Sequence, residues 1–229
     1  VASESCVFGS RFKLKHDVKP GEIVKIDREG LHTHRRFPDK RSYCVHEWLH
    51  FARVDSILDR IDVARLRNSL GQELAKVCGQ LDINMISPVP FAAFTYAEGV
   101  EEILRLPVVQ ALHRPHYGGN YSVIPGNVAG RNILLIDNLV RSGETIKKLV
   151  EMLRQAKAGK IYVGVAAPPV KEDCRYKPNT TETFLASSYR LDDIGQAIGA
   201  DGFYCLSIDS LRSAFGVSSQ YICSKCLEG

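Results

Sequence analysis

Apolar runs of strand length alternate with stretches of helical spacing from about residue 55 to residue 216. The strand candidates are residues 82–90, 131–138, 160–169 and 202–207. The helical candidates are residues 55–80, 92–105, 143–156, 189–200 and 208–216. Two parallel strands need a long crossover between them, which is usually a helix. The alternation therefore predicts an α/β fold, in which helices cover both faces of a parallel sheet.

Residues 1–50 have a different pattern, with short alternating runs between turn residues. In residues 18–31, a Pro-Gly pair precedes the alternating run EIVKID, and a glycine follows it. This pattern is typical of a β-hairpin. The segment is too small to bury a hydrophobic core of its own, so we do not expect it to fold alone.

His46, Glu47 and His50 form the sequence H-E-x-x-H, which binds zinc when it lies on a helix. The surrounding CVHEWLHF alternates between two sets of side chains, which predicts a strand over residues 44–51. Residues four apart on a strand are separated by about 13 Å, whereas two nitrogens bound to one zinc are at most ~4 Å apart. We therefore expect two strand histidines rather than a zinc site.

The totals indicate an ordinary globular protein, because the 229 residues are 45% hydrophobic and 24% charged. No apolar run is long enough to span a membrane, and the N-terminus lacks a signal-peptide pattern, so we expect a cytoplasmic location. The net charge of +4 is small and gives no reason to expect nucleic-acid binding. Seven cysteines are an odd number, which argues against a disulfide framework and leaves metal binding as the alternative.

Polar residues follow the apolar strand candidate at 131–138. In open α/β sheets, ligands bind beyond the carboxyl ends of strands. Asp137 and Asn138 end this strand, and the turn Arg141-Ser142-Gly143-Glu144-Thr145 opens the next helix. The free N–H groups of a helix N-terminus attract a phosphate, so either a phosphate site for a sugar or a polar-capped turn fits this stretch.

This arrangement resembles the phosphoribosyl-diphosphate (PRPP) signature of type I phosphoribosyltransferases, which is an apolar strand, an acidic pair and a turn ending in Gly-x-Thr. Longer stretches resemble, in order, the glutamine phosphoribosylpyrophosphate amidotransferase family. They are ASESC (2–6), VKPGEIVKID (18–27), FARVDS (51–56), NSLGQELA (68–75), VAAPP (165–169), ETFLASSYRLDDIGQAIGADGFYCLS (182–207) and CSKC (223–226). The resemblance covers essentially the whole chain.

The resemblance implies a type I phosphoribosyltransferase fold over residues 51–216. It implies that residues 1–50 are a short β segment left from an N-terminal-nucleophile glutaminase domain, and that residues 217–229 are a cysteine tail. Many members of the family carry a [4Fe-4S] cluster, and this sequence has cysteines where the ligands fall: Cys44, Cys174, Cys223 and Cys226. Four thiolates also suit zinc, and free thiols remain a third alternative. We expect Cys6, Cys78 and Cys205 to be small hydrophobic residues.

The sequence also departs from the family pattern. The family's glutaminase nucleophile is a first-residue cysteine, whereas Val1 has no nucleophilic group and Cys6 is not terminal. We therefore expect that the chain does not hydrolyse glutamine by itself, and that it is a fragment, pairs with another chain, or has lost this function. Asn138 replaces the second acid of the pair, and the pyrophosphate turn reads Pro90-Phe91-Ala92-Ala93. The basic loop that follows is shorter than in the family, and the only cations near it are Arg114, His116 and Arg131.

The resemblance implies transfer of phosphoribose from PRPP, with Mg²⁺, to ammonia, giving 5-phosphoribosylamine in purine biosynthesis. Asp137 and Asn138 would bind the ribose as the catalytic pair, and Arg141, Ser142, Gly143, Glu144 and Thr145 would bind the 5′-phosphate. There are two alternatives. The chain could transfer phosphoribose to a different nitrogen acceptor, or it could be a catalytically inactive, phosphate-binding scaffold or regulatory subunit that carries the cluster. The implied partners are PRPP or a nucleoside monophosphate, a glutaminase domain or subunit, and further copies of the chain in a homo-oligomer.

Overall fold

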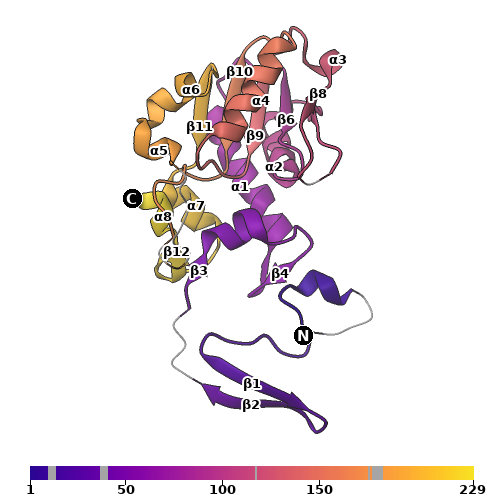
Figure 1. Cartoon of the computed structure of the whole chain (residues 1–229), viewed down its shortest axis with the longest axis vertical. Coiled ribbons are helices and arrows are strands. Elements are labelled where there is room, and N and C mark those ends of the chain that lie inside the picture. Colours follow the sequence, from indigo (N-terminus) through magenta and orange to yellow (C-terminus); the bar gives the residue numbers. More distant parts are fainter. Residues whose placement is uncertain (10–13, 37–40, 117, 175, 177–182) are drawn as a thin grey trace.

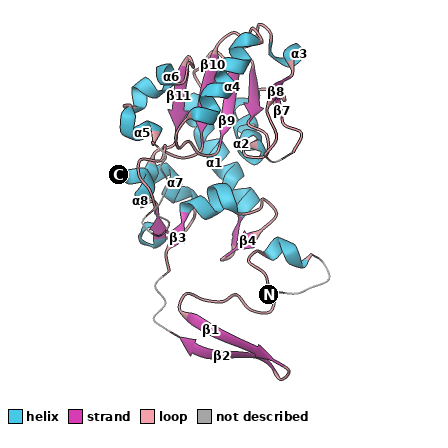
Figure 2. Ribbon diagram, in the orientation of Figure 1, coloured by secondary structure: helices cyan, strands magenta, loops and turns pink. Residues whose placement is uncertain are grey.

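The computed structural model describes residues 1–9, 14–36, 41–116, 118–174, 176 and 183–229. Its centre is a four-stranded parallel sheet, whose strands lie side by side in the upper half of Figures 1 and 2. The strand order is β11 (Gly202–Cys205), β10 (Ile161–Val165), β9 (Ile133–Asp137) and β6 (Met85–Pro88). Every residue of β6, β9 and β10 is buried, as is typical of strands covered on both faces.

Helices cover both faces of this sheet, as the sequence predicts. Helix α4 (Glu144–Gln155) lies in front of β9 and β10 in Figure 1, and helices α1 (Val63–Cys78) and α2 (Phe94–Leu104) lie behind them. On the α1 side, Leu74 reaches to 3.3 Å from where a Cβ at Gly164 of β10 would lie. The buried positions of α4 are Ile146, Leu149, Val150 and Leu153, which is the predicted apolar stripe.

Helices α1 and α2 pack so closely that glycine is required at their contact. A Cβ at Gly71 of α1 would overlap the backbone carbonyl of Tyr96, and a Cβ at Gly99 of α2 would overlap that of Asn68. Around this contact, Asn68 Nδ2 and Gln72 Nε2 donate hydrogen bonds to Glu102, at 3.0 and 2.7 Å. The two backbones therefore touch directly, and this contact fixes the two helices against each other.

The predicted hairpin is present near the N-terminus. Strands β1 (Glu22–Asp27) and β2 (Gly30–Arg36) pair antiparallel and lie far from the sheet, at the bottom of Figure 1. Ile23 and Ile26 of β1 are 47% and 59% exposed, so the hairpin buries little apolar surface. The preceding 3₁₀ turn η1 (Ser5–Phe8) is attached elsewhere, because Glu4 accepts hydrogen bonds from Ser56 Oγ and Arg53 N at 2.7 and 2.8 Å.

Shorter elements join these parts. They are β4 (Ile57–Leu58), β5 (Ile61–Asp62), β7 (Leu112–His113), β8 (Ser122–Val123), α3 (Pro125–Val128), α5 (Leu185–Ser188), η3 (Leu191–Asp193) and α6 (Ile194–Ala197). The C-terminal elements are α7 (Ile208–Ala214), η4 (Ser219–Tyr221), β12 (Ile222–Cys223) and α8 (Lys225–Glu228). Strand β12 pairs in parallel with β3 (Tyr43–Cys44), which brings the C-terminal tail to the start of the α/β unit.

The strand predicted over residues 44–51 is wrong. Strand β3 ends at Cys44, and a π-helical turn, η2 (Glu47–Phe51), follows. The buried residues Val45, Trp48, Leu49 and Ala52 have the helical spacing i, i+3, i+4 and i+7, which the apparent alternation concealed. The short run therefore satisfied both patterns, and packing decided in favour of the helix.

Two predicted helices are shorter than expected. Residues 55–62 form the β4–β5 hairpin, and α1 begins only at Val63, because the Asp62 side chain caps it by accepting from Arg65 N at 3.0 Å. Residues 189–200 contain only the short turns η3 and α6. None of the helices in the described ranges is both long and apolar enough to cross a membrane.

We expect Gly99→Ala to lower the free energy of unfolding by about 1–3 kcal/mol or more, because the added methyl group must push two helix backbones apart. Urea unfolding monitored by circular dichroism measures this change. Gly126→Ala is the matched control, since a Cβ there meets nothing within 4 Å. Equal stability of the two variants would contradict the close contact between α1 and α2.

Candidate functional site

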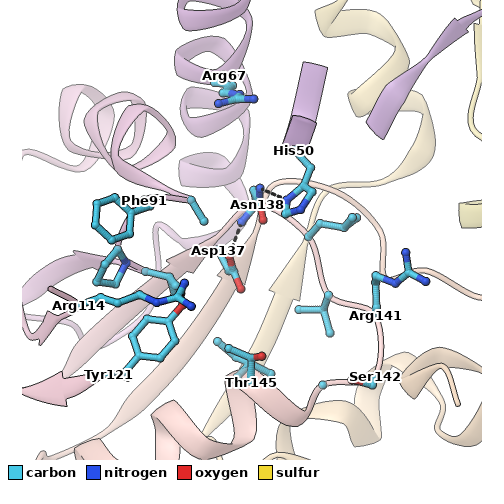
Figure 3. A pocket seen from close by; sticks show the side chains of 17 residues that line it. His50, Arg67, Phe91, Arg114, Tyr121, Asp137, Asn138, Arg141, Ser142 and Thr145 are labelled. Atoms are coloured by element: carbon cyan, nitrogen blue, oxygen red, sulfur yellow. Dashed lines mark hydrogen bonds between the residues drawn. The ribbon is translucent and has the colours of Figure 1, made fainter. Parts of the chain in front are cut away.

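A cavity of about 300 Å³ opens beyond the carboxyl ends of β6 and β9. The predicted residues Asp137, Asn138, Arg141, Ser142, Gly143 and Thr145 all line it. Figure 3 shows Asp137 and Asn138 in the middle, with Arg141 and Ser142 on one side and Phe91, Arg114 and Tyr121 on the other. The structure thus brings the predicted strand end and turn together at one cavity, with the exception of Glu144, which lies outside it.

The turn before α4 combines a left-handed glycine with the N-terminus of a helix. Gly143 has φ of 79°, which a residue with a Cβ rarely adopts, and a Cβ there would lie 2.8 Å from Leu185. The φ value therefore favours glycine at this position, and an added Cβ would also displace the Leu185 side chain. The helix α4 that begins at Glu144 is twelve residues long, and its first N–H groups have no partners within the helix. The Thr145 side chain lines the cavity beside these groups.

Asp137 and Asn138 are nearly buried, with exposures of 8% and 5%. The Asn138 backbone N–H donates to Asp137 Oδ1 at 2.8 Å. Burial raises the pKa of Asp137 to about 7, although this hydrogen bond acts in the opposite direction. Without a ligand, Asp137 is therefore a protonated acid over much of the range below neutral pH, and a cation or hydroxyl ligand would favour its ionised form.

The Asn138 amide is bonded to the turn η2. Its Nδ2 donates to Leu49 O at 3.0 Å and to His50 Nδ1 at 3.1 Å. His50 also lines the cavity, which the sequence reasoning missed because it placed this residue on a strand. The other histidine of the H-E-x-x-H sequence, His46, lies 3.3 Å from Cys226 Sγ instead. Because His46 and His50 lie on a helical turn and not on a strand, their separation along the chain no longer argues against a shared zinc. Their imidazoles nevertheless have different partners, which are Cys226 for His46 and Asn138 for His50.

The opposite wall of the cavity is aromatic and cationic. Phe91 has φ of 66° and is 56% exposed. The Arg114 guanidinium lies 4.6 Å from the centre of the Tyr121 ring and donates to Gly119 O at 2.8 Å. Arg67 of α1 also lines the cavity and was not predicted. The expected cations His116 and Arg131 do not line it.

A second cavity, of about 280 Å³, contains the predicted cysteine set. Cys44, Cys174, Cys223 and Cys226 all line it, together with His46. The β3–β12 pairing places Cys44 directly opposite Cys223, and α8 carries Cys226. Arg141 lines this cavity as well as the first one. Residues that are far apart in the sequence therefore converge here.

The surroundings of this cavity favour the neutral thiol form of Cys226 and Cys44. Burial, and to a smaller extent the neighbouring thiols Cys44, Cys174 and Cys223, raise the pKa of Cys226 to about 11. Burial also raises the pKa of Cys44. If all four cysteines of this cavity were thiolates, they would need a positive charge between them. Of the remaining cysteines, Cys78 is buried, whereas Cys6 and Cys205 are only partly buried.

Comparisons with known proteins identify relatives over the whole chain. No protein-family model matches the chain. Amidophosphoribosyltransferase from Mus musculus is 32% identical over 240 residues, which are 93% of this chain and 46% of the mouse protein. The Escherichia coli enzyme of the same name is 32% identical over 255 residues, or 98% of this chain and 50% of that protein. This chain is thus similar to about half of an amidophosphoribosyltransferase.

Solved structures agree. Glutamine PRPP amidotransferase from B. subtilis, complexed with ADP and GMP, has a TM-score of 0.90 and 28% identity, and the match covers 98% of this chain and 55% of that one. A structure of the allosteric regulatory enzyme of purine biosynthesis has a TM-score of 0.88 and 29% identity. The predicted type I phosphoribosyltransferase fold is therefore confirmed. The chain spans about half the length of the curated relatives that it matches.

We expect part of the stability of the ligand-free protein to fall as the pH rises from about 4 to about 7. In this window folded Asp137, with its pKa of about 7, retains a proton that the unfolded chain loses near the ordinary value of 3.8. The unfolded state therefore binds fewer protons, and the free energy of unfolding declines by up to ~4 kcal/mol from this group.

Asp137→Asn should remove this decline, which urea unfolding at several pH values measures. Asp209→Asn, at an exposed aspartate, is the control for the general effect of losing a carboxylate. If the parent and Asp137→Asn proteins have parallel stability curves over this range, the pKa of Asp137 is not raised.

Proposed function

We propose that this chain is the phosphoribosyltransferase part of an amidophosphoribosyltransferase and that its first cavity binds PRPP. The observation that carries this proposal is the convergence of the glycine-dependent turn 141–145 with Asp137 and Asn138 at a strand end. A phosphate fits the N-terminus of α4, where free N–H groups and the helix dipole favour negative charge. A ribose attached to that phosphate would then lie beside the buried polar pair.

Each residue has a proposed role. Thr145 and Ser142 add hydroxyl donors to the phosphate, and Gly143 lets the backbone approach it closely. Asp137 binds ribose hydroxyls and, when ionised, is a suitable oxygen ligand for the Mg²⁺ that accompanies PRPP. Arg114 is the cation on the pyrophosphate side, and its contacts with Tyr121 and Gly119 O orient it in advance.

In the proposed reaction, ammonia attacks C1 of the ribose, pyrophosphate leaves, and 5-phosphoribosylamine forms for purine biosynthesis. Ammonia is already a nucleophile and needs no strong base. Catalysis then depends on positioning of the two reactants and on stabilisation of the developing charges. Arg67, Arg114 and Arg141 supply positive charge around the cavity, which suits a ligand with several phosphate groups.

Phe91 supports a second candidate function. It occupies the turn where a pyrophosphate would be bound, and its side chain offers no hydrogen bond. A chain that binds phosphoribose without releasing pyrophosphate would act as a scaffold or regulatory subunit. Pyrophosphate release from PRPP and Mg²⁺ with ammonium distinguishes the candidates: binding without release favours the scaffold, and release only with another amine favours a different acceptor.

We also propose that a glutaminase part, on the same or another chain, supplies the ammonia. The support is the length of the relatives and the exposed hairpin β1–β2, whose Ile23 and Ile26 lack an apolar covering. A β structure laid against this hairpin would bury these side chains. Such a partner would also explain why a hairpin with little core of its own lies so far from the sheet.

The second cavity is proposed to hold a [4Fe-4S] cluster. Two sulfurs on one tetrahedral zinc are only ~3.8 Å apart. In the described part of the chain, the only three donor atoms of His, Cys, Asp or Glu within 4.8 Å of one another belong to Asp27, Glu29 and His32, at an exposed turn. The four cysteine sulfurs are therefore spread more widely than zinc requires. This spacing and the cavity volume favour a larger group, in which each thiolate binds its own iron.

Thr145→Val should weaken the binding of ribose 5-phosphate, PRPP and inorganic phosphate alike, because it removes one hydroxyl donor and keeps the side-chain shape. The expected loss is about 0.5–3 kcal/mol, measured by calorimetric titration. Thr95→Val, on α2 outside the cavity, is the control. Unchanged affinity for every phosphate ligand would mean that the phosphate is not bound at this turn.

Protein purified without oxygen should contain about four iron and four sulfide per chain. Cys174→Ser should lose this iron, because it removes one of the four proposed ligands. Cys205→Ser, outside the second cavity, should keep it. Elemental analysis and the visible absorption spectrum measure the content; one zinc in place of iron would contradict the cluster.

A further inference from the structure

The orientation of the Asn138 amide follows from its partners. The Leu49 carbonyl oxygen can only accept hydrogen bonds, and it lies 3.0 Å from both Tyr96 Oη and Asn138 Nδ2. The amide oxygen of Asn138 would be repelled at this position, so the amide nitrogen must occupy it. The amide oxygen Oδ1 then accepts no hydrogen bond from any described residue and lies on a side chain that lines the first cavity.

This orientation in turn sets the hydrogen positions on His50. One Asn138 Nδ2 hydrogen points to Leu49 O, and the other is available to His50 Nδ1 at 3.1 Å. Because Nδ2 is only a donor, Nδ1 must be the acceptor. A neutral imidazole that accepts at Nδ1 carries its hydrogen on Nε2. Figure 3 shows the His50 ring beside Asn138, at the edge of the cavity.

The Nε2–H group of His50 is free to donate to a ligand. Within the described part of the chain, no residue forms a hydrogen bond with it, and the His50 side chain is exposed. Its surroundings keep the ring neutral: burial of part of the ring lowers the pKa of His50, and the charges of Arg67 and Arg141 lower it further. The nearby His46 is also held neutral, because burial lowers its pKa to about 4.

We propose that His50 and Asn138 act as one ribose-binding unit. Asn138 Oδ1 accepts a hydrogen bond from one hydroxyl of a vicinal pair, and His50 Nε2–H donates one to the oxygen of the neighbouring hydroxyl. A hydroxyl both donates and accepts, so a diol matches one acceptor beside one donor. This inference rests on the proposed function, because it assumes that the cavity binds a ribose phosphate. It makes His50 a specificity-determining residue, and it gives the Asn138 amide nitrogen a role that an aspartate would not have, which is donation to His50 Nδ1.

Two histidine variants separate the two ring nitrogens. The side-chain amide of His50→Gln places its nitrogen near the position of Nε2, whereas that of His50→Asn reaches only the position of Nδ1. With ribose 5-phosphate, His50→Asn should bind roughly three- to tenfold more weakly than the parent, and His50→Gln should retain most of the affinity. All three proteins should bind inorganic phosphate equally, which also shows that the variants are folded. His34→Asn, at an exposed histidine on β2, is the control.

Nitrogen-15 NMR of labelled histidine tests the ring directly, without a ligand. The parent should have the hydrogen on Nε2, and Asn138→Asp, which offers only acceptors, should move a hydrogen to Nδ1. A hydrogen on Nδ1 in the parent would overturn the proposal. So would equal binding of ribose 5-phosphate by the parent and His50→Asn, while the proposed function stands. If the parent binds neither ribose 5-phosphate nor phosphate, the proposed function fails and the inference fails with it.

Discussion

Three side chains from different elements bond the carbonyl groups of the turn η2, and both candidate sites depend on this connection. Arg67 of α1 donates to Trp48 O and Ala52 O, each at 2.8 Å. Tyr96 of α2 and Asn138, just after β9, both donate to Leu49 O. The last carbonyls of a helical turn have no partners within the turn, and buried carbonyls need partners. The turn is therefore stable only where these three elements meet.

The same turn separates the two cavities. Its preceding residue His46 faces the cysteines, and His50 faces the proposed ribose site. The Trp48 ring holds this turn in place by packing edge to face against two other rings. Its centre lies 5.5 Å from that of Tyr43 and 5.8 Å from that of Phe215. Arg141 lines both cavities from the other side. A group bound by the cysteines would thus hold the C-terminal tail, β3 and the back of the ligand cavity together.

Local patterns predicted most of the α/β unit, because its elements are defined by neighbours in the sequence. The strand 131–138, the turn 141–145 and the helix 143–156 needed only apolar spacing and one glycine. The turn η2 could not be predicted in this way, since eight residues fit both an alternating and a helical pattern and the deciding hydrogen bonds come from Arg67, Tyr96 and Asn138. For the same reason, periodicity alone could not pair Cys44 with Cys223; that prediction came from the family resemblance, and the β3–β12 pairing supplies its physical basis.

In the turn after β6, the shape of the backbone and the chemistry of the side chain are independent of each other. Phe91 adopts a left-handed backbone conformation that costs about 1–2 kcal/mol for a residue with a Cβ. The turn keeps this shape because Val89 N donates to Ile136 O at 2.9 Å, and Ala92 N and Ala93 N both donate to Val89 O at 3.2 Å. Strand pairing and the start of α2 therefore determine the backbone, whatever side chain occupies position 91. The polar side of the cavity is built independently, by β9 and α4. The proposed recognition of a phosphorylated ribose can consequently persist in this fold while the groups that assist departure of pyrophosphate change.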